Sequence, residues 1–142
     1  MDLPLNEQVL RSWVELTSIF KNPRLTEGMT YNESAVMLFI YERFQRTGAA
    51  IPLRELLAKT RMTKSLLHRT LASLLERGLI RKQPDGENRR SVCVSLQPEK
   101  LADFIAVHEK SLALVDQVID IIGAEDAQTF VRISGKLIEE NL

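Results

Sequence analysis

Two short helical patterns stand three or four residues apart near the middle of the sequence, and the hydrophobic period changes directly after them. The first pattern spans about Leu53 to Lys59, and the second runs from Thr63, a good N-cap residue, to Arg77. This spacing is typical of a helix-turn-helix. After Gly78, the segments Leu79 to Gln83 and Ser91 to Leu96 have the character of short strands. The sequence therefore predicts a helix-turn-helix followed by a β-hairpin.

Helical patterns flank this motif on both sides. A helix is expected over Leu5 to Phe20 and another from Ser34 to Thr47, and two more follow Gln97 and Gly123 near the end of the chain. Thr30 and Glu33 have the spacing of a capping box before the second of these helices, and Gly48 is suited to end it. The helix over Leu5 to Phe20 carries two apolar stripes, and one small core cannot cover both. We therefore expect a homodimer whose terminal helices interlock.

This order of elements defines the expected fold class, which is mainly α with a small β-hairpin wing. It is a winged helix-turn-helix with N- and C-terminal dimerisation helices. Residues 1–49 and 98–142 are assigned to the helical dimerisation region, and 50–97 to the DNA-binding lobe. The length of 142 residues suits one compact domain overall.

The charge is distributed unevenly, although 19 basic and 19 acidic residues leave a formal net charge of zero. Residues 50–97 hold ten Lys and Arg against four acids, an excess of +6, whereas 98–142 hold four against nine, a deficit of −5. A basic segment on an otherwise acidic chain is the usual sign of a nucleic-acid interface. Here it coincides with the helix-turn-helix and the hairpin.

The second helix of the motif carries the side chains expected to contact DNA. Such a helix enters the major groove, where its N-terminal residues meet the base edges. Its apolar face is marked by Leu67, Leu71, Leu74 and Leu75, and the opposite face presents Thr63, Lys64, Ser65, His68 and Arg69. Hydroxyl, imidazole and cationic groups can bond phosphates or bases, and Arg69 is the strongest candidate for a guanine or phosphate contact.

Two adjacent arginines, Arg89 and Arg90, stand at the tip of the predicted hairpin. Neighbouring residues on a strand point to opposite faces. We therefore expect one arginine to enter the narrow, negative minor groove and the other to support the hairpin or hold a phosphate.

The sequence lacks the residues and segments that metal-binding, catalytic and membrane proteins require. One cysteine excludes a disulfide framework, and with two distant histidines it does not make a zinc site, so no metal or cofactor is expected. There is no glycine-rich phosphate loop and no arrangement suited to a catalytic triad, so the chain is not expected to be an enzyme. The longest apolar run is too short for a membrane helix and the start is unlike a signal peptide. A cytoplasmic setting without membrane contact is expected.

Three segments resemble the MarR family of bacterial transcriptional regulators. They are MTYNE before the second long helix, LRELLAKTRMTKSLLHRTLASLLERGLIRK across the motif, and NRRSVCVSLQ at the wing. The resemblance implies an obligate homodimer that binds a pseudo-palindromic operator on double-stranded DNA. It further implies a repressor that a small aromatic or lipophilic ligand releases. Leu66 departs from the small polar residue common in the family, and it either contacts a thymine methyl or is buried by a rotation of the helix.

A ligand pocket, if present, is expected where the dimerisation helices meet the DNA-binding lobe. Its candidate lining residues are Trp13, Tyr31, Tyr41 and Phe44, which could equally pack in the core or the dimer. Cys93 is expected on the Ser91 and Ser95 side of its strand, away from the apolar face, without a neighbour that would activate the thiol. The alternative function is a winged-helix protein-interaction or adaptor module without specific DNA binding.

Overall fold

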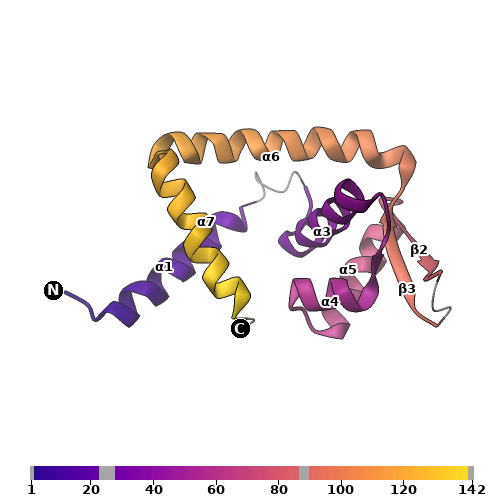
Figure 1. Ribbon diagram of the computed structural model, residues 1–142, viewed down its shortest axis with the longest axis horizontal. Helices are drawn as coiled ribbons and strands as arrows, with labels where there is room; N and C mark the ends of the chain where they lie inside the picture. The colour runs from indigo at the N-terminus through magenta and orange to yellow at the C-terminus, as the bar shows by residue number, and fades with distance from the viewer. Residues whose placement is uncertain (1, 23–27, 87–89, 141–142) are drawn as a thin grey trace. The chain divides into compact units, whose positions relative to one another are not determined.

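The computed structural model describes residues 2–22, 28–86 and 90–140 of the chain. In chain order it has α1 (Leu5–Phe20), α3 (Tyr31–Thr47), β1 (Ile51–Pro52), α4 (Leu53–Thr60), α5 (Lys64–Glu76), β2 (Ile80–Pro84), β3 (Val92–Leu96), the 3₁₀ helix η1 (Pro98–Lys100), α6 (Leu101–Ile122) and α7 (Ala124–Glu139) (Figure 1). Helices dominate and the strands form one small sheet, as the predicted fold class requires.

The chain divides into two compact units, Met1–Phe104 and Ile105–Leu142, with the boundary inside α6. The length suggested one compact domain. The first turn of α6 belongs to the first unit, where the ring of Phe104 packs against that of Tyr41 in α3, and neither α6 nor α7 has a buried residue. The functional division into a dimerisation region and a DNA-binding lobe stays a prediction. None of the described helices is long and apolar enough to cross a membrane.

Local signals set the ends of the central helices. At the start of α3, the Thr30 hydroxyl accepts from the Glu33 amide and the Glu33 carboxylate accepts from the Thr30 amide, both at 3.0 Å. This is the capping box that the sequence predicts. At the other end, Gly48 caps the helix with φ of 71°, a conformation that glycine adopts without a Cβ clash. The helix predicted from Pro98 begins instead as the 3₁₀ turn η1.

The sheet has three antiparallel strands in the order β1-β3-β2. The predicted hairpin is β2 and β3, in a register that places Ile80 opposite Leu96. Strand β1 was not predicted from the sequence, because two residues are too few to show an alternating pattern. It pairs with the other edge of β3, where Ile51 lies opposite Val94, so β3 is the central strand.

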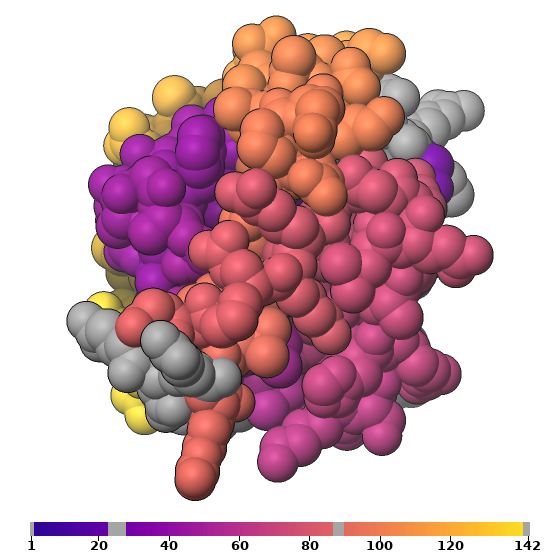
Figure 2. Space-filling model, turned by 90° about the vertical axis from the view of Figure 1, so that its right-hand side faces the viewer, coloured from indigo at the N-terminus to yellow at the C-terminus, as the bar shows by residue number. Residues whose placement is uncertain are grey.

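One apolar core joins the sheet to the three helices α3, α4 and α5. Its fully buried side chains come from every one of these elements and include Met37, Ile40, Ile51, Leu56, Leu67, Leu71, Leu74, Ile80 and Val94. Because each element contributes to the same core, the helix-turn-helix and the wing strands are held in one fixed arrangement. This arrangement places α5 and the hairpin on one face of the first unit (Figure 2).

Candidate nucleic-acid interface

Helix α5 buries one side and exposes the other. Thr63 is its N-cap, and its hydroxyl accepts from the Leu66 amide at 3.2 Å. The buried side consists of Leu67, Thr70, Leu71 and Leu74, and the exposed side includes all five residues predicted on this helix to contact DNA, Thr63, Lys64, Ser65, His68 and Arg69. Leu75 and Leu66 are half-buried, so Leu66 belongs fully to neither side. The predicted contact face is therefore available to a partner.

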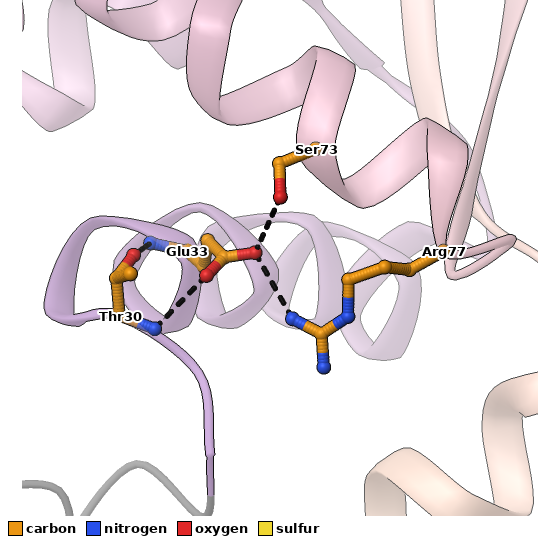
Figure 3. A network of polar contacts seen from close by, with 4 residues as sticks. All are labelled: Thr30, Glu33, Ser73 and Arg77. Atoms are coloured by element: carbon orange, nitrogen blue, oxygen red, sulfur yellow. Dashed lines mark hydrogen bonds and ion pairs between the residues drawn. The ribbon is translucent and has the colours of Figure 1, made fainter.

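The orientation of α5 depends on Glu33, which lies at the start of α3 and is only 7% exposed (Figure 3). One carboxylate oxygen of Glu33 accepts from the Ser73 hydroxyl at 3.1 Å and from the Arg77 guanidinium at 3.0 Å. Both donors belong to the C-terminal end of the helix-turn-helix, Ser73 within α5 and Arg77 as its C-cap. The same carboxylate closes the capping box through its other oxygen. It therefore ties the start of α3 to the end of α5.

Burial of Glu33 by itself would raise the pKa of its carboxyl. The hydrogen bonds from the Thr30 amide, the Ser73 and Thr30 side chains and Arg77 outweigh burial and lower that pKa. The carboxylate is therefore charged near neutral pH, and this network stabilises the fold through its ionised form. Sequence analysis found the capping box but missed the contacts to α5, because no local pattern links residues about forty positions apart.

A cleft of about 330 Å³ lies between α4, α5 and the start of β3. Three of the predicted DNA contacts, Lys64, His68 and Arg90, line it together. Arg54, in the first turn of α4, is a fourth basic residue in the lining and was not predicted. Arg69 is exposed on α5 and lies outside this lining. The four basic side chains lie far apart in the sequence, and only the packing of α4, α5 and the hairpin against one another brings them to one cleft.

The hairpin is closed by the Asp85 amide, which donates to the Ser91 carbonyl at 2.9 Å. Arg90 is exposed at the end of the loop that this bond closes. Arg89, the other predicted wing contact, lies outside the described residues. On the strands, Arg81 donates through Nε to the Ser95 hydroxyl at 3.1 Å.

Cys93 was predicted on the side of its strand that carries Ser91 and Ser95, away from the apolar face. Its side chain is nevertheless buried, with 7% exposure. Cys93 lies in the central strand, where it pairs with Pro52 of β1 on one side and with Gln83 of β2 on the other. Burial, together with the charge of Asp85, raises the pKa of the thiol above its usual value. A buried thiol with a raised pKa is a poor nucleophile.

The four aromatic residues predicted to line a ligand pocket are not gathered around one cavity. Trp13 lies in a shallow hollow formed by residues of α1 and its C-cap Lys21, and Phe44 lines a separate cavity of about 320 Å³ beside β2 and the start of α6. Tyr41 is buried, with its ring centroid 4.9 Å from that of Phe104, and Tyr31 is exposed. Their role in ligand binding stays a prediction. Among the described residues, no group of three or more His, Cys, Asp or Glu is placed to hold a metal ion.

The helices α4 and α5, the three-stranded sheet and the basic face define a winged helix-turn-helix protein. Residues 27–91 match the family model described as MarR family. The resemblance that the sequence suggested is thereby confirmed. MarR-family regulators are DNA-binding transcription factors and not enzymes.

Solved structures of similar fold span nearly the whole chain. Sco3205, a MarR family transcriptional regulator from Streptomyces coelicolor in complex with DNA, has a TM-score of 0.81 and 21% identity, covering 99% of this chain and 94% of that one. A probable transcriptional regulator from Pseudomonas aeruginosa has a TM-score of 0.74 and 20% identity, covering 92% and 95%. NadR in complex with 4-hydroxyphenylacetate has a TM-score of 0.72 and 16% identity, covering 96% and 93%. At this identity they establish the fold. No curated protein matched the sequence.

Proposed function

We propose that this chain is a sequence-specific DNA-binding regulator of transcription that acts as a homodimer on a pseudo-palindromic operator in the bacterial cytoplasm. The observation that carries the proposal is the convergence of Lys64, His68 and Arg90 on one cleft beside the exposed face of α5. Cations on the recognition helix and the wing suit a duplex, because one element reads the major groove and the other reaches the backbone or minor groove. The complex of Sco3205 with DNA supports the same use of the fold.

Repression, and release by a small aromatic or lipophilic ligand, are the finer parts of this proposal. The complex of NadR with 4-hydroxyphenylacetate supports a ligand of that class, since NadR shares the fold. The aromatic residues Trp13, Tyr31, Tyr41 and Phe44 remain the candidates for its pocket.

The test of DNA binding uses a duplex selected from random sequence by the wild-type protein. The dissociation constant of the protein–DNA complex is measured with this duplex and with a scrambled duplex, each at several salt concentrations. We expect preference for the selected duplex and a steep fall in affinity with salt, because neutralised phosphates release counterions. A protein-interaction adaptor would show no preference for any duplex, and that outcome would reject the proposed function.

The homodimer is supported by apolar side chains that the single chain leaves exposed on α1, α6 and α7. None of these three helices has a buried residue, and Leu5 is 74% and Ile121 83% exposed. Apolar surface of this extent is unusual for a monomer and typical of an interface. In a dimer on DNA, we expect the two recognition helices in successive major grooves, about 34–36 Å apart.

Replacing Val14 of α1 with aspartate tests the dimer. Val14 is exposed in the single chain, so a monomer would tolerate the change. In a dimer that buries this residue, the change loses about 1.5 kcal/mol or more per subunit of apolar burial and adds a charge. We expect the dimer dissociation constant, measured by analytical ultracentrifugation, to rise at least about tenfold. Ser12→Asp, at an exposed polar position on the opposite side of the same helix, is the matched control. Equal dissociation constants for the two variants would exclude Val14 from the interface.

A further inference from the structure

The cleft between α4, α5 and β3 is called the basic cleft here, defined by the four side chains Arg54, Lys64, His68 and Arg90 that line it. They come from three separate elements, the two helices of the motif and the end of the wing loop. The other described lining residues are Ser91 and apolar side chains, and no carboxylate is among them. A concave site lined by several cations attracts an anion.

The positions of Arg54 and Lys64 on their helices reinforce this attraction. Arg54 lies in the first turn of α4, and Lys64 is the first residue of α5. The N-terminal end of a helix carries a partial positive charge, so a cation there lowers helix stability slightly. Helix stability therefore does not explain either residue, whereas binding of an anion explains both.

The acid nearest to Arg54 in the sequence does not neutralise the cleft. Glu55 forms an ion pair with Arg43 of α3, which engages its carboxylate away from the cleft lining. Leu56, fully buried, anchors the same turn of α4 in the core. Arg54 itself is exposed, with its backbone held in place by this anchored turn.

We propose that the basic cleft binds one backbone phosphate of the duplex in each half-site, and that Arg54 is a DNA-contacting residue on the first helix of the motif. This inference rests on the proposed function. The guanidinium fork of Arg54 suits the two non-bridging oxygens of a phosphodiester, and Lys64 and Arg90 approach the same group from the recognition helix and the wing. Such a contact sets the register of α5 in the major groove without reading a base.

The test compares wild type with Arg54→Gln on the duplex selected from random sequence by the wild-type protein. We expect Arg54→Gln to lose about eightfold in affinity per half-site at about 0.1 M salt, equally on selected and scrambled duplexes. The slope of log affinity against log salt concentration should fall in magnitude by about 0.9 per half-site. Thermal unfolding should show unchanged or slightly raised stability, because a cation is removed from a helix N-terminus.

A scan with methylphosphonates, which neutralise one phosphate at a time, locates the contact. One position per half-site should weaken wild-type binding and have little further effect on Arg54→Gln. Arg46→Gln is the matched control, since Arg46 is an exposed arginine of α3 outside the cleft lining. It should leave the affinity, the salt slope and the methylphosphonate pattern close to those of wild type.

The outcomes separate the inference from the proposed function. If wild type shows no preference for the selected duplex, the proposed function fails and the inference fails with it. If wild type binds specifically and Arg54→Gln behaves as Arg46→Gln does, only the inference is rejected. A loss of affinity in Arg54→Gln with an unaltered methylphosphonate pattern would also reject it, because Arg54 would then act on DNA by another route.

Discussion

Replacing both Arg69 and Arg90 with alanine is expected to remove most of the specific affinity for DNA. The two arginines belong to separate elements, α5 and the wing loop, and both are exposed. A lost base contact costs about 1–3 kcal/mol, and contacts on separate elements add, so the double variant should lose about 2–6 kcal/mol per half-site. This corresponds to a complex weaker by about thirtyfold to about twenty-five-thousandfold. Titration of the selected duplex by fluorescence anisotropy at matched salt measures it.

The single variants show which arginine reads bases. A base contact should relax sequence preference at one position, whereas a phosphate contact should weaken all duplexes alike. Arg46→Ala serves as the control for the loss of a positive charge elsewhere on the same unit. If both single variants bind the selected duplex as tightly as wild type does, the assignment of α5 and the wing to the DNA interface is wrong.

Replacing Glu33 with alanine is expected to lower the free energy of unfolding by about 2–4 kcal/mol, because it removes a buried charged acceptor and leaves its donors without that partner. The carboxylate accepts from the Thr30 amide, Ser73 and Arg77. The side chain of Arg77 is 44% exposed, so its ion pair with Glu33 contributes the smaller part of this free energy. The buried hydrogen bonds contribute the larger part. Urea unfolding at one fixed protein concentration measures the change. Glu42→Ala, an exposed glutamate on the same helix, should have little effect.

The pH dependence of stability tests the same carboxylate. The pKa of Glu33 is lower in the folded protein than in an unfolded chain. At pH values between these two pKa values, the unfolded chain therefore binds more protons than the folded protein. The stabilisation by ionised Glu33 is therefore complete above the ordinary glutamate pKa and is lost as pH falls through the lowered value. The advantage of wild type over Glu33→Gln should shrink as pH falls below the ordinary glutamate pKa of about 4.3. A difference that stays constant over this range would mean that the charge of Glu33 contributes no stability.

Local signals predicted most of the secondary structure. The ends of α1 and the capping residues Thr30, Gly48 and Thr63 all lie where the sequence places them. Caps and breakers act over three or four residues, and a helix of three or more turns shows its apolar face several times. Strand β1 fails both conditions, because two residues carry no period and its pairing partner lies about forty positions away.

The candidate site was predictable in part. The exposed face of α5 followed from helical spacing, since the residues opposite a buried stripe must face solvent or a partner. Arg54 and the burial of Cys93 did not follow, because each depends on an element that is distant in sequence. Arg54 and Arg90 line one cleft only because α4 lies beside the wing, and Cys93 is buried in a strand that pairs with both β1 and β2.

By itself, the sequence determined the order of the helices, the limits of the helix-turn-helix and the concentration of positive charge on it. These properties are local, because they depend on caps, hydrophobic period and composition within a few turns of chain. Only the tertiary structure decided that one carboxylate, Glu33, joins α3 to α5, and that four basic residues line one cleft. The physical reason is the shared core, which sets the distances between elements and so determines which distant side chains meet.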